Sequence, residues 1–150
     1  MPSTEELLGT RQRILVTGGA GFIGGAVVRR LLRESNAIVF NLDKMGYASD
    51  LTSIEEIIHE LGVEHENRHQ LLAIDLCDAK AVQQAVKDAD PDLVMHLAAE
   101  SHVDRSISGP GVFVESNVNG TYNLLQAVRS HFEQLSVQRR EQFRLHHIST

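Results

Sequence analysis

Short, continuous apolar runs alternate along the chain with longer segments in which apolar residues recur every three or four positions. Runs of this length, bounded by charged residues or glycine, are typical of strands that are buried on both faces of a parallel sheet. The pattern predicts five strands, at residues 14–16, 37–42, 70–74, 93–97 and 143–148.

The segments between these runs have the periodicity of amphipathic helices. We expect helices at residues 22–33, 51–61, 79–87 and 110–132. Asp50 and Asp78 are candidate N-caps of the second and third helices, and Gly62 is a candidate stop. Residues 98–108 and 133–142 are polar and are expected to be a loop and a connector.

This alternation of strands and helices predicts an α/β fold, in which a doubly wound parallel sheet is connected by right-handed crossovers. A length of 150 residues suffices for one such domain. No repeat, low-complexity tract or linker divides the chain, so we expect one domain over residues 1–150.

Composition narrows the class of protein. Hydrophobic residues make up 42% of the chain and charged residues 23%, as in ordinary soluble domains. No apolar run reaches the ~18–20 residues of a membrane span, and residues 1–13 lack the apolar core of a signal peptide. The net charge is −6 without a basic run, which argues against nucleic acid and anionic membranes as partners. We expect a cytoplasmic protein that binds neither.

A metal site is not expected. The single cysteine, Cys77, excludes an intrachain disulfide framework and a cysteine-rich zinc site. His146 and His147 are neighbours on a predicted strand, so their side chains point to opposite faces. The histidines at positions 59, 65 and 69 have no fixed register and no evident carboxylate partner.

A glycine-rich turn follows the first predicted strand and leads into the first helix. Gly18, Gly21 and Gly24 form a G-x-x-G-x-x-G pattern. The first glycine allows a tight turn, the second allows the backbone to approach a pyrophosphate, and the third allows the helix to pack closely against the strand. The helix N-terminus offers free N–H groups to phosphates. The turn in this context predicts dinucleotide binding and a Rossmann-like sheet.

Acidic residues end the next two strands. Asp43 lies 19 residues after Gly24, where a carboxylate accepts hydrogen bonds from a ribose 2′-OH and repels a 2′-phosphate. Asp43 therefore favours NAD over NADP, although Lys44 beside it weakens that discrimination and a turn role stays open. For Asp75, a structural turn and a contact with adenine are equally good interpretations.

Small residues after the fourth strand allow the backbone to run beside a cofactor. The polar loop at 102–106 faces either solvent or a second ligand.

Several stretches together resemble the extended short-chain dehydrogenases and, within them, the dTDP-glucose 4,6-dehydratases. They are ILVTGGAGFIG at 14–24, DKMGYA at 43–48, HLAAESHVDRSI at 96–107, NVNGTY at 117–122 and HHIST at 146–150. The glycine motif is common to the superfamily, whereas AAESHVDRSI separates this family from most sugar-nucleotide epimerases. The likeness covers nearly the whole chain after the first dozen residues.

The resemblance implies roles for particular residues. The pyrophosphate of NAD is expected to contact Gly18, Gly21, Phe22, Ile23 and Gly24. The adenosine part is expected to contact Asp43, Lys44, Gly46, Ala48, Asp75 and Leu76. The nicotinamide half is expected to contact Leu97, Ala98, Ala99 and Ser116. The glucosyl part of the substrate is expected to contact Ser101 and Thr150. Gly25, Gly46 and the pair at 49–50 depart from the residues usual in the family and soften the expected adenosine contacts.

The family's enzymes hold NAD tightly, oxidise the sugar at C4, eliminate water across C5 and C6 and return the hydride to C6, so they are lyases. Their Asp-Glu pair follows HHIST directly, and a Tyr-x-x-x-Lys pair and a C-terminal substrate domain come later. None of these lies within residues 1–150. We therefore expect the chain to be the N-terminal, cofactor-binding part of such an enzyme, without a catalytic residue or turnover of its own. The full-length parent is expected to be a homodimer that acts on dTDP-glucose.

Two alternatives remain open from the sequence. In the first, the full-length parent is a related nucleotide-sugar epimerase, dehydratase or decarboxylase. In the second, the chain is a stand-alone NAD-binding module without catalysis.

Overall fold

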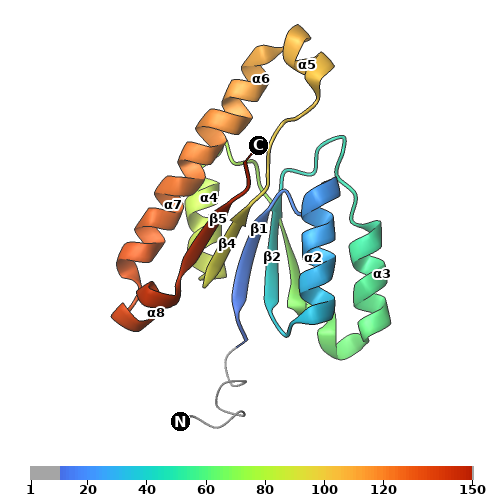
Figure 1. The fold of residues 1–150 in the computed structure, drawn as a ribbon, viewed down its shortest axis with the longest axis vertical. Helices are drawn as coiled ribbons and strands as arrows, with labels where there is room; N and C mark the ends of the chain where they lie inside the picture. The colour runs from blue at the N-terminus through green and yellow to red at the C-terminus, as the bar shows by residue number, and fades with distance from the viewer. Residues whose placement is uncertain (1–10, 150) are drawn as a thin grey trace.

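A computed structural model describes residues 11–149 of the chain. Its five strands form one parallel sheet with helices on both faces (Figure 1). The strand order is β3-β2-β1-β4-β5, so the sheet grows in both directions from β1, and the predicted doubly wound fold is confirmed. The strand bounds are β1 Arg13–Thr17, β2 Ile38–Asp43, β3 His69–Ala73, β4 Leu93–His96 and β5 Arg144–His147.

Two apolar layers hold the sheet. Leu15 of β1 belongs to the core that α4 (Ala79–Ala89) and α7 (Thr121–Gln134) cover. Ile14 and Val16 belong to the opposite core, which α2 (Phe22–Glu34) and α3 (Thr52–Leu61) cover. Successive residues of a strand face opposite sides, so one short apolar run supplies both layers. Burial of each such side chain stabilises the fold by about 1.5–3 kcal/mol.

The prediction that the strands are buried on both faces is correct for β1 and β2 and wrong for the two edge strands. β1 and β2 are almost entirely buried, whereas β3 is mostly exposed and every residue of β5 is exposed. The difference follows from the strand order, because β3 and β5 are the two edges of the sheet. An apolar run therefore identifies a strand here without fixing its place in the sheet.

The ends of the helices agree with most of the expected caps. The Asp78 carboxylate accepts a hydrogen bond from the N–H of Ala81 at 3.0 Å, which confirms it as the N-cap of α4. Leu51 occupies the N-cap position of α3, and Asp50 instead accepts a hydrogen bond from the N–H of Thr52 at 2.9 Å. Gly62 ends α3 with φ of 97°, and a 3₁₀ helix, η1 (Val63–Arg68), follows it.

The second half of the chain differs from the prediction in three places. The expected helix at 110–132 is α6 (Pro110–Val114), a π-helical segment η2 (Glu115–Gly120) and α7, which together form one long rod (Figure 1). The expected loop contains α5 (Val103–Ser108), and the expected connector contains α8 (Val137–Gln142). Both are single short helices without an apolar stripe, so periodicity could not reveal them. No helix among residues 11–149 is long and apolar enough to cross a membrane.

Candidate functional site

A cleft of about 550 Å³ opens at the carboxyl ends of β1, β2 and β4. Chain connections leave in opposite directions on the two sides of this point, because β2 and β4 are the neighbours of β1. Ligands of open α/β sheets bind at such a switch point. The predicted contacts that line this cleft are Gly18, Gly21, Phe22, Ile23, Gly24, Asp43, Lys44, Gly46, Ala48, Asp75, Leu76, Leu97, Ala98, Ala99, Ser101 and Ser116. Thr150 lies outside the described residues.

The glycine turn joins β1 to α2 at the floor of the cleft. Gly18 has φ of 71°, and its N–H donates to the carbonyl of Leu42 at 2.8 Å, so the turn rests on β2. A Cβ on Gly24 would lie 2.0 Å from the carbonyl oxygen of Gly18, so the helix packs directly on the turn. The sequence argument expected Gly24 to pack on the strand, and the structure shows that it packs on the turn that leaves it.

The N-terminus of α2 faces the cleft without a competing acceptor. Its N-cap, Gly21, makes no side-chain capping bond, and the first turn contains no acidic residue. The first N–H groups of a helix have no partner inside the helix and carry partial positive charge. Phe22 beside them is 95% exposed. This helix end therefore offers its donors to an anionic ligand.

Asp43 combines a structural role with a remaining acceptor. One carboxylate oxygen accepts from the N–H of Met45 and the hydroxyl of Ser49, both at 2.8 Å. The other accepts from the N–H of Ala20 at 3.1 Å, which ties the glycine turn to β2. A carboxylate oxygen has two lone-pair positions, so this second oxygen can accept one more bond. The turn role is thus present, and a ribose contact is compatible with it.

Lys44 crosses the cleft to the segment that follows β4. Its Nζ donates to Oε1 of Glu100 at 2.5 Å, and this hydrogen bond raises the pKa of Lys44. Nearby, the guanidinium of Arg105 lies 3.8 Å from the ring centre of Tyr47. The Tyr47 ring centre also lies 5.8 Å from that of His102. The segments that follow β2 and β4 are therefore joined by one ion pair and two ring contacts.

The π-helical segment η2 holds Glu100 through Asn117. The Asn117 side-chain oxygen accepts from the N–H of Glu100 at 2.8 Å, and its Nδ2 donates to the Glu100 carbonyl at 3.0 Å. Ser116, one residue earlier, lines the cleft. Single π-helical turns inside long helices occur frequently at functional sites. The long helix thus contributes both a lining residue and a brace for the facing loop.

Hydrogen bonds also fix the end of β4. The N–H groups of Leu97 and Ala98 both donate to Oγ1 of Thr17 at 3.2 Å. With its two acceptor positions filled, the Thr17 hydroxyl donates to Nδ1 of His96, 2.6 Å away. The protonated nitrogen of His96 is then Nε2, which donates to the hydroxyl of Thr121 at 2.9 Å.

Burial keeps His96 neutral. The residue is 2% exposed, and desolvation, followed by the charge of His147, lowers its pKa to about 4. A neutral ring satisfies both hydroxyls at once, whereas an imidazolium has no acceptor for Thr17. No pattern in the sequence indicated this network.

The remaining candidates divide between the cleft and the surrounding structure. The Asp75 carboxylate accepts from the N–H of Cys77 at 2.9 Å, so its turn role is present and an adenine contact stays a prediction. His102 lines the cleft, whereas Asp104 and Ser106 of α5 do not. No three His, Cys, Asp or Glu side chains in the described part of the chain converge on a common metal position. Residues missed by the sequence analysis that also line the cleft are Leu42, Tyr47, Ser49, Ile74, Glu100 and Ile148.

Residues 15–150 match the protein family described as GDP-mannose 4,6 dehydratase. The chain belongs to this family. It is 46% identical over 138 residues to the dTDP-glucose 4,6-dehydratase of Salmonella typhimurium, covering 92% of this chain and 37% of the relative. It is 49% identical over 138 residues to an Escherichia coli dTDP-glucose 4,6-dehydratase, covering 92% and 36%. The resemblance that the motifs indicated is therefore confirmed.

Solved structures give the same picture of the fold. DesIV, a dTDP-glucose 4,6-dehydratase from Streptomyces venezuelae solved with NAD and TYD bound, has a TM-score of 0.69 and 38% identity over 80% of this chain and 36% of its own. A Thermus thermophilus UDP-glucose 4-epimerase in complex with NAD has a TM-score of 0.65 and 32% identity over 80% and 34%. The chain thus spans little more than a third of the length of the proteins it matches.

Proposed function

We propose that the chain binds NAD as the cofactor-holding part of a nucleotide-sugar 4,6-dehydratase that acts on dTDP-glucose. One observation carries this proposal: the glycine turn, the open end of α2 and the carboxylate of Asp43 line a single cleft at the switch point of the sheet. The names of the relatives and the NAD bound in DesIV support the cofactor and the reaction class.

The geometry divides this cleft into regions that suit the parts of a dinucleotide. The free N–H groups of α2 suit a pyrophosphate, and the remaining acceptor on Asp43 suits a ribose hydroxyl. The backbone of Leu97 and Ala98, fixed by Thr17, borders the opposite region, which suits the nicotinamide half. Bound NAD would supply hydride acceptance from the sugar and hydride return to it. Ser101 lines the same cleft and is proposed to contact the glucosyl group.

Cofactor binding is testable by calorimetric titration of the purified protein, freed of nucleotide, with NAD. We expect the wild-type protein to bind NAD saturably. Asp43→Ala, which removes the carboxylate, should lose this binding. Failure of the wild type to bind millimolar NAD would contradict the proposal. The absence of turnover by the 150 residues alone stays a prediction, checked by incubating them with NAD and dTDP-glucose.

An epimerase is the second candidate, because the Thermus thermophilus UDP-glucose 4-epimerase shares this fold at 32% identity. Analysis of the product formed from dTDP-glucose by the protein that contains this chain distinguishes the two. A 4-keto-6-deoxy sugar supports the dehydratase, whereas a C4 epimer supports the alternative. The family name points to a GDP sugar and the relatives to a dTDP sugar, so both nucleotides belong in the assay.

A homodimer is proposed from the outer face of the long rod. The side chains of Val114, Val118, Tyr122 and Leu125 are 42–61% exposed. Their spacing of four, four and three residues places them on one helix face. Leu124 and Val128 face the sheet instead, so this apolar stripe is turned away from the core. Light scattering of the full-length protein that contains this chain is expected to give a dimer, which Val118→Glu converts to a monomer.

A further inference from the structure

Two neighbouring residues at one end of the cleft have opposite preferences for the cofactor. The carboxylate of Asp43 repels a 2′-phosphate, whereas an ammonium such as that of Lys44 attracts one. A cleft in which Lys44 is free to reach the ligand would accept NADP as well as NAD. The partner of Lys44 therefore decides which preference prevails.

The structure shows that this ammonium is already engaged. Lys44 donates to Oε1 of Glu100 at 2.5 Å, and the Glu100 side chain is only 13% exposed. The charge of Asp75 adds to that of Glu100 in raising the pKa of Lys44. Lys44 thus stays protonated, and its charge is matched by a carboxylate within hydrogen-bond distance.

Glu100 is also fixed in position. Its N–H and its carbonyl both hydrogen-bond to the side chain of Asn117, at 2.8 and 3.0 Å. Asn117 lies in η2, within the long rod, so the backbone of Glu100 cannot turn away without breaking two hydrogen bonds. The carboxylate that holds Lys44 is therefore carried by a backbone segment that is fixed to the long rod.

The balance of charge around Lys44 is negative. Asp43, Asp75 and Glu100 all line the cleft with Lys44, and three carboxylates against one ammonium leave an excess of negative charge. A phosphate monoester carries about −1.5 to −2 charges near neutral pH. A 2′-phosphate would meet this charge without a free cation among these four side chains to balance it.

We propose that Glu100 enforces selectivity for NAD over NADP by holding the ammonium of Lys44. Glu100 acts through Lys44 and is a positioning residue of the cofactor site. The inference rests on the proposed NAD-binding function and extends it to the basis of cofactor choice.

Glu100→Gln tests the inference, because it removes the carboxylate charge at nearly constant size and leaves only a neutral amide oxygen to accept from Lys44. We expect the ratio of the Kd for NADP to that for NAD to fall about tenfold, the change produced by one charge-assisted hydrogen bond to phosphate. Both constants are measured by calorimetry on nucleotide-free protein. Glu56→Gln, which removes an exposed carboxylate of α3 outside the cleft, is the matched control and should leave the ratio unchanged.

Further variants separate the ion pair from a general effect of charge. Glu100→Asp keeps the carboxylate and should retain most of the selectivity. The double variant Lys44→Met/Glu100→Gln should lose the gain in NADP binding, because no ammonium is left to release. An unchanged ratio in Glu100→Gln, or a gain that persists in the double variant, would overturn the inference alone. Failure of the wild type to bind either nucleotide would overturn the proposed function together with it.

Discussion

A methyl group added at Gly24 is expected to push α2 away from the turn on which it packs. A Cβ there would lie 2.0 Å from the carbonyl oxygen of Gly18 and 2.7 Å from its carbonyl carbon, where 3.4 Å begins ordinary contact. Both atoms belong to the backbone, so no change of rotamer relieves the overlap. The helix must shift, and its first N–H groups shift with it.

The size of the effect follows from two opposing contributions. Forcing an extra methyl group into a packed site costs about 1–3 kcal/mol, and a rigid backbone contact places Gly24→Ala at the upper end. Replacing glycine by alanine inside a helix stabilises the helix by about 1 kcal/mol. We therefore expect the free energy of unfolding to fall by about 2 kcal/mol. NAD affinity should fall at least about tenfold as the helix donors move.

Gly25, the next residue of the same helix, provides a matched control. A Cβ there would lie 3.3 Å from Nη1 of Arg29, the end of a flexible side chain, and 3.5 Å from the carbonyl oxygen of Gly19. The first contact is slightly tight but is relieved by a small shift of the flexible Arg29 side chain, and the second is ordinary van der Waals contact. Gly25→Ala should therefore stabilise the protein by about 0.5–1 kcal/mol and leave NAD affinity unchanged.

Urea unfolding followed by far-ultraviolet circular dichroism measures both stabilities, and calorimetric titration measures both affinities. The two variants differ only in which side of one helix turn receives the methyl group. Equal urea midpoints for Gly24→Ala and Gly25→Ala, together with equal NAD affinities, would refute the argument that the turn and the helix are in direct backbone contact.

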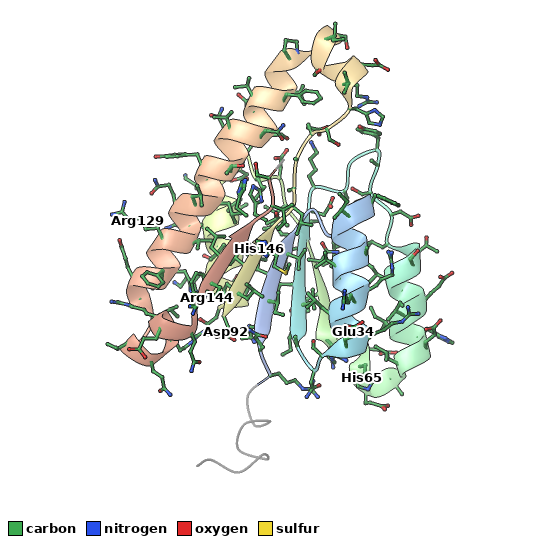
Figure 2. All side chains as sticks on the ribbon, in the orientation of Figure 1. Glu34, His65, Asp92, Arg129, Arg144 and His146 are labelled. Atoms are coloured by element: carbon green, nitrogen blue, oxygen red, sulfur yellow. The ribbon has the colours of Figure 1, made fainter. Side chains whose placement is uncertain are left out.

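Three further predictions concern stability. Burial lowers the pKa of His96 from 6.5 to about 4, so the unfolded state binds the proton more readily than the folded state. The free energy of unfolding should therefore fall by up to about 3 kcal/mol as the pH is lowered from 6.5 to 4. His96→Gln should show a smaller fall in urea midpoints across this range. The Arg139 guanidinium donates to both carboxylate oxygens of Asp90 and to one of Asp92, so Arg139→Lys should lower the free energy of unfolding by about 1–2 kcal/mol. Arg129 forms an exposed ion pair at the outer side of α7 (Figure 2), so Arg129→Lys should change it by under about 0.5 kcal/mol in the same assay. Asp78→Ala should cost about 1 kcal/mol in urea unfolding through the lost cap of α4, and a cost near zero would contradict that role.

The sequence predicted the parts of this fold that depend on local periodicity. Ile14 to Val16 formed a recognisable strand because one apolar run supplies both cores of the sheet. The glycine turn was recognisable because only small residues fit where α2 packs on Gly18. Since the carboxyl ends of parallel strands share one edge, residues after separate strands could be expected to meet in one cleft.

Features that depend on contacts between distant segments could not be predicted in this way. Glu100 pairs with Lys44 across 56 positions of sequence, and His96 links Thr17 to Thr121 from two other elements. No spacing rule connects such residues. The π-helical segment was hidden for a different reason, because its one large apolar residue, Val118, lies at a spacing from Val114 that an ordinary helix also has.

These long-range contacts also show that the protein's own hydrogen bonds hold the cleft in shape. Asp43 ties the glycine turn to the loop after β2, and Thr17 with His96 fixes the start of the segment after β4. Asn117 then holds that segment at Glu100. A ligand that binds such a site need not order these backbones, and affinity that would otherwise be lost to ordering is retained. The N–H groups at the start of α2, which have no side-chain cap, are left for the ligand to satisfy.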